Sequence, residues 1–160
     1  LLQVGSDKYT QDQVERFRTY VLKLCQSRQI RLVAEEMSRD GLSDYGKITT
    51  ISGTVAKDLD LSHCYVDLTN DERANLGIDR AALAMVSLRL SLTPSQVATL
   101  EETFDKVREC CWLARILAAN LWPTLFVCGA SHVPSMKYLF NSVGQRAEVA
   151  CYDYCHDNEP

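Results

Sequence analysis

The sequence lacks the patterns that identify several large classes of protein. It has no run of basic residues and a net charge of −4, which argues against a nucleic-acid backbone as the main partner. No apolar stretch is long enough to cross a bilayer, and the start has no signal-peptide pattern, so we expect no membrane partner and a cytoplasmic location. The chain begins at Leu1 rather than Met, directly in a predicted strand, so we expect further residues upstream.

Several nucleotide-binding and catalytic motifs are also missing. The turn Gly129-Ala-Ser-His132 has neither the Gly-x-Gly-x-x-Gly spacing of a dinucleotide-binding loop nor the lysine of a P-loop. No Gly-x-Ser-x-Gly turn presents a nucleophilic serine. Ser131 directly precedes His132, and adjacent side chains rarely point together, so we do not expect a nucleophile–base pair there.

Cysteine is plentiful, but its spacing is irregular. The chain has seven cysteines, mostly within apolar segments, which is typical of buried free thiols in a reducing compartment. Cys151, Cys155 and His156 lie near the spacing of zinc ligands, which leaves a zinc-stabilised structural module open. No second pair of ligands completes a tetrahedral site, however.

What the sequence does contain is an alternation of strands and helices. Apolar runs predict five strands, at residues 1–4, 30–34, 64–68, 124–128 and 147–152. Capping boxes at Thr10 and Thr69 and a proline-containing start at Thr93 predict helices, the last about 27 residues long and ending at Trp122-Pro123. Residues 38–43 are expected as a loop and residues 48–59 as a weak helix.

The alternation predicts a three-layer α/β fold. We expect a mostly parallel five-stranded sheet with helices on both faces and one long helix before the fourth strand. A single domain would cover residues 1–154, followed by a polar tail at residues 155–160.

Residues 123–136 organise this prediction. They form an apolar strand, a tight turn at Gly129-Ala130 and a helix with Pro134 in its first turn. His132 therefore lies beyond the carboxyl end of a parallel strand and next to a helix N-terminus. Ligands of open α/β sheets bind at this edge.

Acidic and polar residues are expected at the same edge, because the carboxyl ends of parallel strands meet there. Glu35 and Glu36 with His132 would either bind a divalent metal or do acid–base work. Alternatively, a glutamate caps a neighbouring helix and His132 bonds to the backbone. The strand ends also supply the candidate ligand-binding residues, which are Gly5, Asp7, Asp67, Gly129, Ala130 and Ser131.

The long helix contributes a further candidate. Arg108 shares a helix face with Cys111, Trp112 and Arg115 by its spacing. It could reach an anionic ligand or a strand-end carboxylate, or it could be solvated.

Three segments together resemble the TraB/Tiki, ChaN and erythromycin-esterase superfamily. They are Val33-Ala-Glu-Glu36, then Arg108-Glu109 followed by Trp112-Leu-Ala-Arg-Ile116, and Phe126-Val-Cys-Gly-Ala-Ser-His132. Members have an early Gly-x-x-His, glutamates after the second strand, a Glu-Arg-Asn-like helix and a Gly-Ala-Gly-His-like turn. The early histidine has no counterpart here, and the helix reads Arg-Glu without the asparagine.

The resemblance implies a hydrolase-like site, metal-dependent in some members. Glu35 and Glu36 match the acidic positions, His132 matches the late histidine, and Arg108 and Glu109 match the helix motif in part. Some members of this superfamily bind ligands although no reaction is established for them.

Two functions follow as expectations. The first is hydrolysis of an ester, amide or similar bond in a small-molecule or peptide ligand by Glu35, Glu36 and His132, assisted by Arg108, with the cofactor unknown or a divalent metal. The second is a non-catalytic binding or regulatory protein that homodimerises through the long helix. An exposed Trp112 and Ile116 would favour the second.

Overall fold

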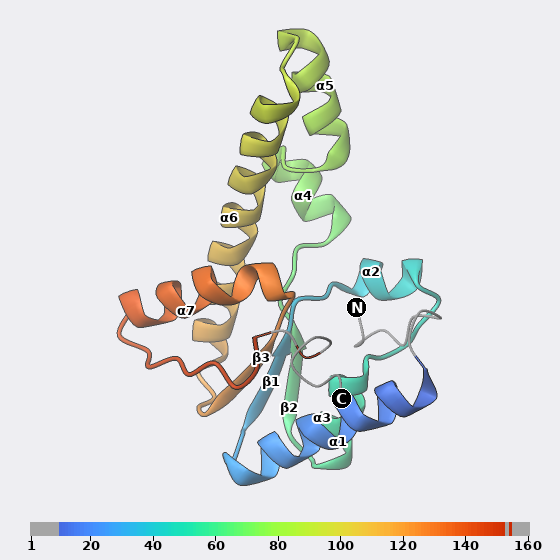
Figure 1. Ribbon diagram of the computed structural model, residues 1–160, viewed down its shortest axis with the longest axis vertical. Coiled ribbons are helices and arrows are strands. Elements are labelled where there is room, and N and C mark those ends of the chain that lie inside the picture. The colour runs from blue at the N-terminus through green and yellow to red at the C-terminus, as the bar shows by residue number, and fades with distance from the viewer. Residues whose placement is uncertain (1–9, 153, 155–160) are drawn as a thin grey trace.

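The computed structural model describes residues 10–152 and residue 154, and its centre is a three-stranded parallel sheet (Figure 1). The strands are β1 (Leu32–Glu35), β2 (Ser62–Tyr65) and β3 (Thr124–Val127), in the order β2-β1-β3. Leu32 pairs with Ser62 on one side and with Thr124 on the other. The α/β class and the parallel pairing are therefore confirmed.

The expected sheet of five strands is not supported. Residues 147–152 have no strand structure, because side chains rather than a neighbouring strand hold them. The Tyr20 hydroxyl donates to the carbonyl of Ala150 (3.1 Å), and Arg28 forms an ion pair with Glu148 (2.8 Å). The predicted strand at residues 1–4 and the tail at residues 155–160 lie outside the described residues.

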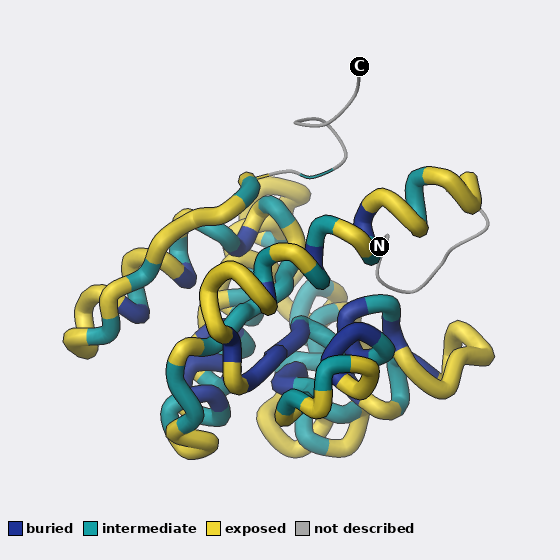
Figure 2. Tube along the Cα trace, turned by 90° about the horizontal axis from the view of Figure 1, so that it is seen from below, coloured by how far each residue is buried: buried dark blue, intermediate teal, exposed yellow. Residues whose placement is uncertain are grey.

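Helices cover both faces of the sheet. Val33 and Leu125 face α1 (Gln11–Ser27) and α3 (Ile51–Asp58), where they pack against Val21 and Val55. Ala34 and Phe126 point to the other face and pack against α6 (Pro94–Ala119) and α7 (Val133–Ser142). Figure 2 shows that buried residues concentrate around the strands. The alternation of side chains along each strand thus builds two cores and three layers.

Capping residues fix the helix starts as the sequence predicts. Thr10, Thr69 and Thr93 each form a complete capping box, at α1, α4 (Asn70–Leu76) and α6. Asp79 caps α5 (Arg80–Leu90). Gly77 ends α4 in the left-handed conformation (φ 66°), which suits glycine because it has no Cβ.

One short helix and the ends of two elements differ from the prediction. Residues 38–43 are not a loop, because Ser38 caps the short helix α2 (Arg39–Asp44) by accepting from the amide of Gly41. The long helix stops at Ala119, with Asn120 left-handed, before Trp122-Pro123. Strand β2 ends at Tyr65, although the buried Val66 and Leu68 continue its apolar run.

α5 and the first half of α6 form a helical arm that stands away from the sheet (Figure 1). No residue of α5 is buried, whereas Trp112, Leu113 and Ile116 in the second half of α6 pack into the core. None of the described helices is long and apolar enough to span a membrane.

Candidate functional site

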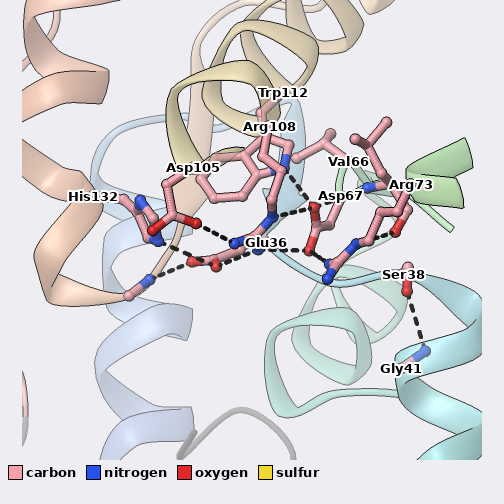
Figure 3. A network of polar contacts seen from close by, with 12 residues as sticks. Glu36, Ser38, Gly41, Val66, Asp67, Arg73, Asp105, Arg108, Trp112 and His132 are labelled. Atoms are coloured by element: carbon pink, nitrogen blue, oxygen red, sulfur yellow. Dashed lines mark hydrogen bonds and ion pairs between the residues drawn. The ribbon is translucent and has the colours of Figure 1, made fainter. Parts of the chain in front are cut away.

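The carboxyl ends of the strands bring four of the predicted residues together, as expected for a parallel sheet. Glu36 follows β1, Asp67 follows β2, and Gly129 and His132 follow β3. Arg108 reaches this edge from α6, and the side chains of Glu36, Asp67, Arg108 and His132 lie close together (Figure 3).

Arg108 is the centre of an ion-pair cluster. Its guanidinium bonds to Asp67 (2.8 Å), Glu36 (3.1 Å) and Asp105 (2.7 Å) and stacks on the Trp112 ring, 5.0 Å from the centroid. Burial alone would lower the pKa of Arg108, but the carboxylates, Asp67 first, raise it above its usual range. Arg108 therefore stays charged, and that charge is already neutralised by its neighbours.

Asp67 is the buried anion of this cluster. Besides Arg108 it accepts from the indole of Trp112 (2.9 Å) and pairs with Arg73 (2.5 Å). Burial would raise the pKa of Asp67, but the bonds from Arg108 and Trp112 and the charge of Arg73 outweigh it and lower that pKa. Asp67 thus holds Arg108 in place.

A second group, the pair of Glu109 and His132, adjoins the cluster. Nδ1 of His132 lies 2.7 Å from Oε1 of Glu109, which also accepts from Ser135 Oγ (2.6 Å). Both residues of the pair are buried, and the imidazole edge contacts Trp112. We assign the Nδ1–H tautomer from this bond, which leaves the Nε2 lone pair free to accept a proton.

Nε2 of His132 points toward Glu36. The distance to Glu36 Oε1 is 3.6 Å, longer than a direct hydrogen bond. The other oxygen of Glu36 accepts from the amide of Gly129 (2.7 Å). The gap is too short for a water in line between the two atoms, but a water or hydroxyl group beside them could hydrogen-bond to both.

Glu35 does not join this site, although it precedes Glu36. Successive residues of a strand face opposite sides, and the Glu35 carboxylate lies under α3. It accepts from Thr50 Oγ1 (2.5 Å) and bonds to His63 Nε2 (2.7 Å), while its Oε2 is buried and has no hydrogen-bond partner among the described residues. Glu35 is thus a fully buried link between β1, β2 and α3.

The metal site proposed from Glu35, Glu36 and His132 is not assembled by the described residues. Glu35 is on the other face of the sheet from His132. Within residues 10–152 and 154, no group of three or more His, Cys, Asp or Glu side chains is arranged to hold a metal ion. Only Glu36 and His132 converge.

Cys128 lies beside the site but is not a nucleophile at neutral pH. Burial, with the negative charges of Glu36 and Glu109, raises the pKa of its thiol to about 12. Six cysteines are described, and five of them, Cys25, Cys64, Cys110, Cys111 and Cys128, are free thiols, while the predicted zinc residues Cys155 and His156 lie beyond the described part of the chain.

A groove of about 940 Å³ opens beside β3 and reaches the site at one end. Its walls come from α1, β3, α7 and residues 145–152 and 154, and its lining is more apolar than polar, with Phe17, Leu24, Leu125 and Phe140 among the contributors. Glu36, Gly129 and Ala130 also line it. A ligand in this groove could therefore touch the strand-end residues.

The structure adds functional candidates that the sequence did not single out. Ser135 and His63 acquire their partners only through the fold. The sequence indicates Glu109 only together with Arg108, as a partial match to a helix motif, yet it lies on the buried face of α6 with Trp112 and Ile116, and a buried carboxylate requires a partner. Gly5 and Asp7 lie outside the described residues.

Comparison with known proteins identifies no relative of this chain. No protein-family model matches the sequence, and neither the curated proteins nor the solved structures give a significant match.

Proposed function

We propose that the protein is a hydrolase that cleaves an ester, amide or similar bond, with His132 as its acid–base residue. The observation that carries this proposal is the buried Glu109–His132 pair, whose free Nε2 faces Glu36 at the strand edge. A carboxylate that orients an imidazole and stabilises its protonated form is the arrangement that many hydrolases use. The resemblance to the TraB/Tiki, ChaN and erythromycin-esterase superfamily points to the same reaction class.

In this mechanism a water molecule lies beside the facing atoms of Glu36 and His132 and hydrogen-bonds to both. The water attacks the carbonyl carbon while its proton passes to Nε2 of His132, and Glu109 stabilises the imidazolium that forms. The same proton then passes to the leaving oxygen or nitrogen as its bond to carbon breaks. The imidazole thus returns to its starting state.

The turn after β3 supplies donors for the oxyanion. Ala130 and Ser131 begin the short helix that leads into α7, and the first amides of a helix have no partner within it. They would stabilise negative charge on the carbonyl oxygen. Arg108 acts as a positioning residue, because it fixes Glu36 and is itself neutralised by three carboxylates.

This version of the reaction needs no metal ion. Glu36 binds the water, and His132, oriented by Glu109, moves its proton.

The test is the hydrolysis of p-nitrophenyl acetate and p-nitroacetanilide by wild type, His132→Ala and Glu109→Gln. We expect His132→Ala to lower kcat/KM by about 10²- to 10⁴-fold, with partial rescue by added imidazole, since a free base can replace the missing one. Glu109→Gln should lower kcat and change the pH profile. Glu101→Gln, an exposed carboxylate on α6 that does not line the groove, is the matched control. A folded His132→Ala variant with wild-type turnover would remove His132 from the reaction.

The second candidate is a non-catalytic binding protein that homodimerises. Trp112 and Ile116 are both fully buried in the protein's own core, so this part of the long helix offers no surface to a partner. The observation that favours a dimer is on α5. Ala81, Ala84, Met85 and Leu88 are all exposed and form one stripe at i, i+3, i+4 and i+7, opposite the side that packs on α6.

This α5 stripe is self-complementary in size. In an antiparallel pair of α5 helices, Ala81 would face Leu88 and Ala84 would face Met85, so each large side chain meets a small one. The stripe carries no charge. We propose it as the contact if the protein dimerises.

A further inference from the structure

Among the described residues, no strand lies beside the outer edge of β3. β3 is the last strand in the order β2-β1-β3, and among the described residues it pairs only with β1. The carbonyls of Pro123 and Val127 accept from Arg31 and Glu36, so the odd-numbered positions of β3 face β1. Because backbone groups alternate sides along a strand, the N–H and C=O groups of Thr124, Phe126 and Cys128 point away from β1.

These outward backbone groups face the groove of about 940 Å³, which is lined by residues from Trp122 to Ala130. An unpaired strand edge is a template for another extended chain. Backbone N–H and C=O groups in an apolar setting also need hydrogen-bond partners. The groove therefore presents regularly spaced donors and acceptors between apolar walls.

The two walls suit alternating side chains. α1 contributes Phe17 and Leu24 on one side, and α7 contributes Met136 and Phe140 on the other. In a strand added to β3, successive side chains would point to these two walls in turn. An acyl chain or a compact apolar ligand would fill the same walls and leave the edge of β3 unpaired.

The charged residues that line the groove are cationic in sum, with Arg28, Lys137 and Arg146 against Glu36 and Glu148, and Glu36 is already paired with Arg108. Neither Lys137 nor Arg146 forms an ion pair with a described residue. The other charged pair at the rim, Arg28 with Glu148, is already neutral. The occupant is therefore expected to carry negative charge.

We infer that the groove binds an extended, acidic polypeptide segment, which adds to the sheet as a fourth strand next to β3. This inference rests on the proposed function and deepens it, since it names a polypeptide as the substrate class. A segment bound along β3 has one end at Glu36, Gly129 and Ala130. His132 itself does not line the groove, but Glu36 at this end does, and its carboxylate lies 3.6 Å from Nε2 of His132.

The experiment uses a capped heptapeptide, acetyl-Val-Thr-Val-Glu-Val-Thr-Val-amide, labelled with fluorescein for anisotropy. A second peptide has the same sequence with alternate amides N-methylated, which removes hydrogen-bond donors and keeps the apolar side chains. We expect the N-methylated peptide to bind at least tenfold more weakly, and Lys137→Glu with Arg146→Glu to weaken binding of the unmodified peptide. Lys106→Glu, an exposed lysine on α6 that does not line the groove, is the matched control.

Amide hydrogen exchange, read by NMR, shows where the peptide lies. Exchange at Phe126 and Cys128 should be fast in the free protein and at least tenfold slower with the unmodified peptide. Slow exchange without peptide would mean that the chain covers its own edge, and would overturn the inference. Equal binding of both peptides, or no binding, would also overturn it.

These readouts do not depend on turnover. If His132→Ala loses p-nitrophenyl acetate hydrolysis and the wild type does not bind the peptide, the hydrolase proposal stands and the polypeptide substrate is excluded. If the peptide binds at β3 but the wild type has no hydrolytic activity, the hydrolase proposal is excluded and the peptide-binding site at β3 stands.

Discussion

Glu35 and Glu36 are adjacent in sequence but take part in separate networks. Glu36 faces α6 and α7 and belongs to the strand-end site, whereas Glu35 faces α3 and bonds to Thr50 and His63. The sequence shows that only one of the two needs to face the crevice, because side chains alternate along a strand. It does not show which one, since that depends on the register of β1 against its neighbours.

Asp67 should contribute strongly to stability. We expect Asp67→Asn to lower the free energy of unfolding by about 3 kcal/mol at pH 7, because it leaves the buried Arg108 without its main counter-charge. Denaturant unfolding measures this loss. Asp105→Asn, whose carboxylate is 47 % exposed, should cost less than about 1 kcal/mol.

The contribution of Asp67 also has a defined pH dependence. Its pKa is lowered in the folded state, so the unfolded state takes up the proton first as the pH falls. The stabilisation is present above the ordinary value of 3.8 and is lost as the pH falls below it toward the folded pKa. An unfolding free energy that is identical in Asp67→Asn and wild type at pH 7 would contradict this role.

For Cys128 we expect a loss of stability at alkaline pH, whereas for Asp67 the loss is at acidic pH. Its pKa is raised from 9.0 to about 12, so between these values the unfolded state loses a proton that the folded state keeps. The free energy of unfolding should fall with rising pH in this window, by up to about 1.4 kcal/mol per pH unit. Urea unfolding at pH 8 and pH 10 should show a smaller difference for Cys128→Ala than for wild type. Cys110→Ala, an exposed thiol, serves as control.

At the scale of elements, the N-terminus of α3 links a helix cap to the buried Glu35. Thr50 Oγ1 accepts from the amide of Gly53 and donates to Glu35. We expect Thr50→Val to lower the free energy of unfolding by about 2 kcal/mol, since it removes the cap and a partner of a buried carboxylate. The rate of p-nitrophenyl acetate hydrolysis should stay within a few-fold of wild type. A loss of activity as large as that of His132→Ala would instead indicate that Glu35 takes part in catalysis.

Elements with local signals were predicted well. Thr10, Thr69 and Thr93 announce their helices because the capping bonds join residues only three apart. Residues 147–152 look like a strand but are held by Tyr20 and Arg28, far away in sequence. The same reason limits the site. His132 and Glu36 stand out at strand ends, but the link from His132 to Glu109 forms only when α6 packs against α7.

At the scale of the whole molecule, the α5 stripe gives a test of association. We expect wild type to form a concentration-dependent dimer, measured by light scattering after gel filtration. Leu88→Glu should keep the protein monomeric, because it would place a charge opposite Ala81 of the second copy. Leu88 is 83 % exposed, so the change should leave the fold intact. Thr99→Glu, on the exposed side of α6, is the matched control.

A wild-type protein that stays monomeric over the whole concentration range would exclude this contact. Association that persists in Leu88→Glu would place the interface elsewhere.

The arm also affects the order in which the sheet can assemble. β1 finds its partner in β2 about 30 residues along the chain, but its partner in β3 lies about 90 residues along. Closing the longer loop costs about 1 kcal/mol more in chain entropy. Half of that loop is α4, α5 and α6, and α5 pairs with α6, its neighbour in sequence. Once these helices have folded, the loop has fewer flexible residues, and bringing β3 next to β1 costs less chain entropy. Although α5 buries no residue, we therefore expect deletions within the arm to slow the pairing of β3 with β1 more than that of β2.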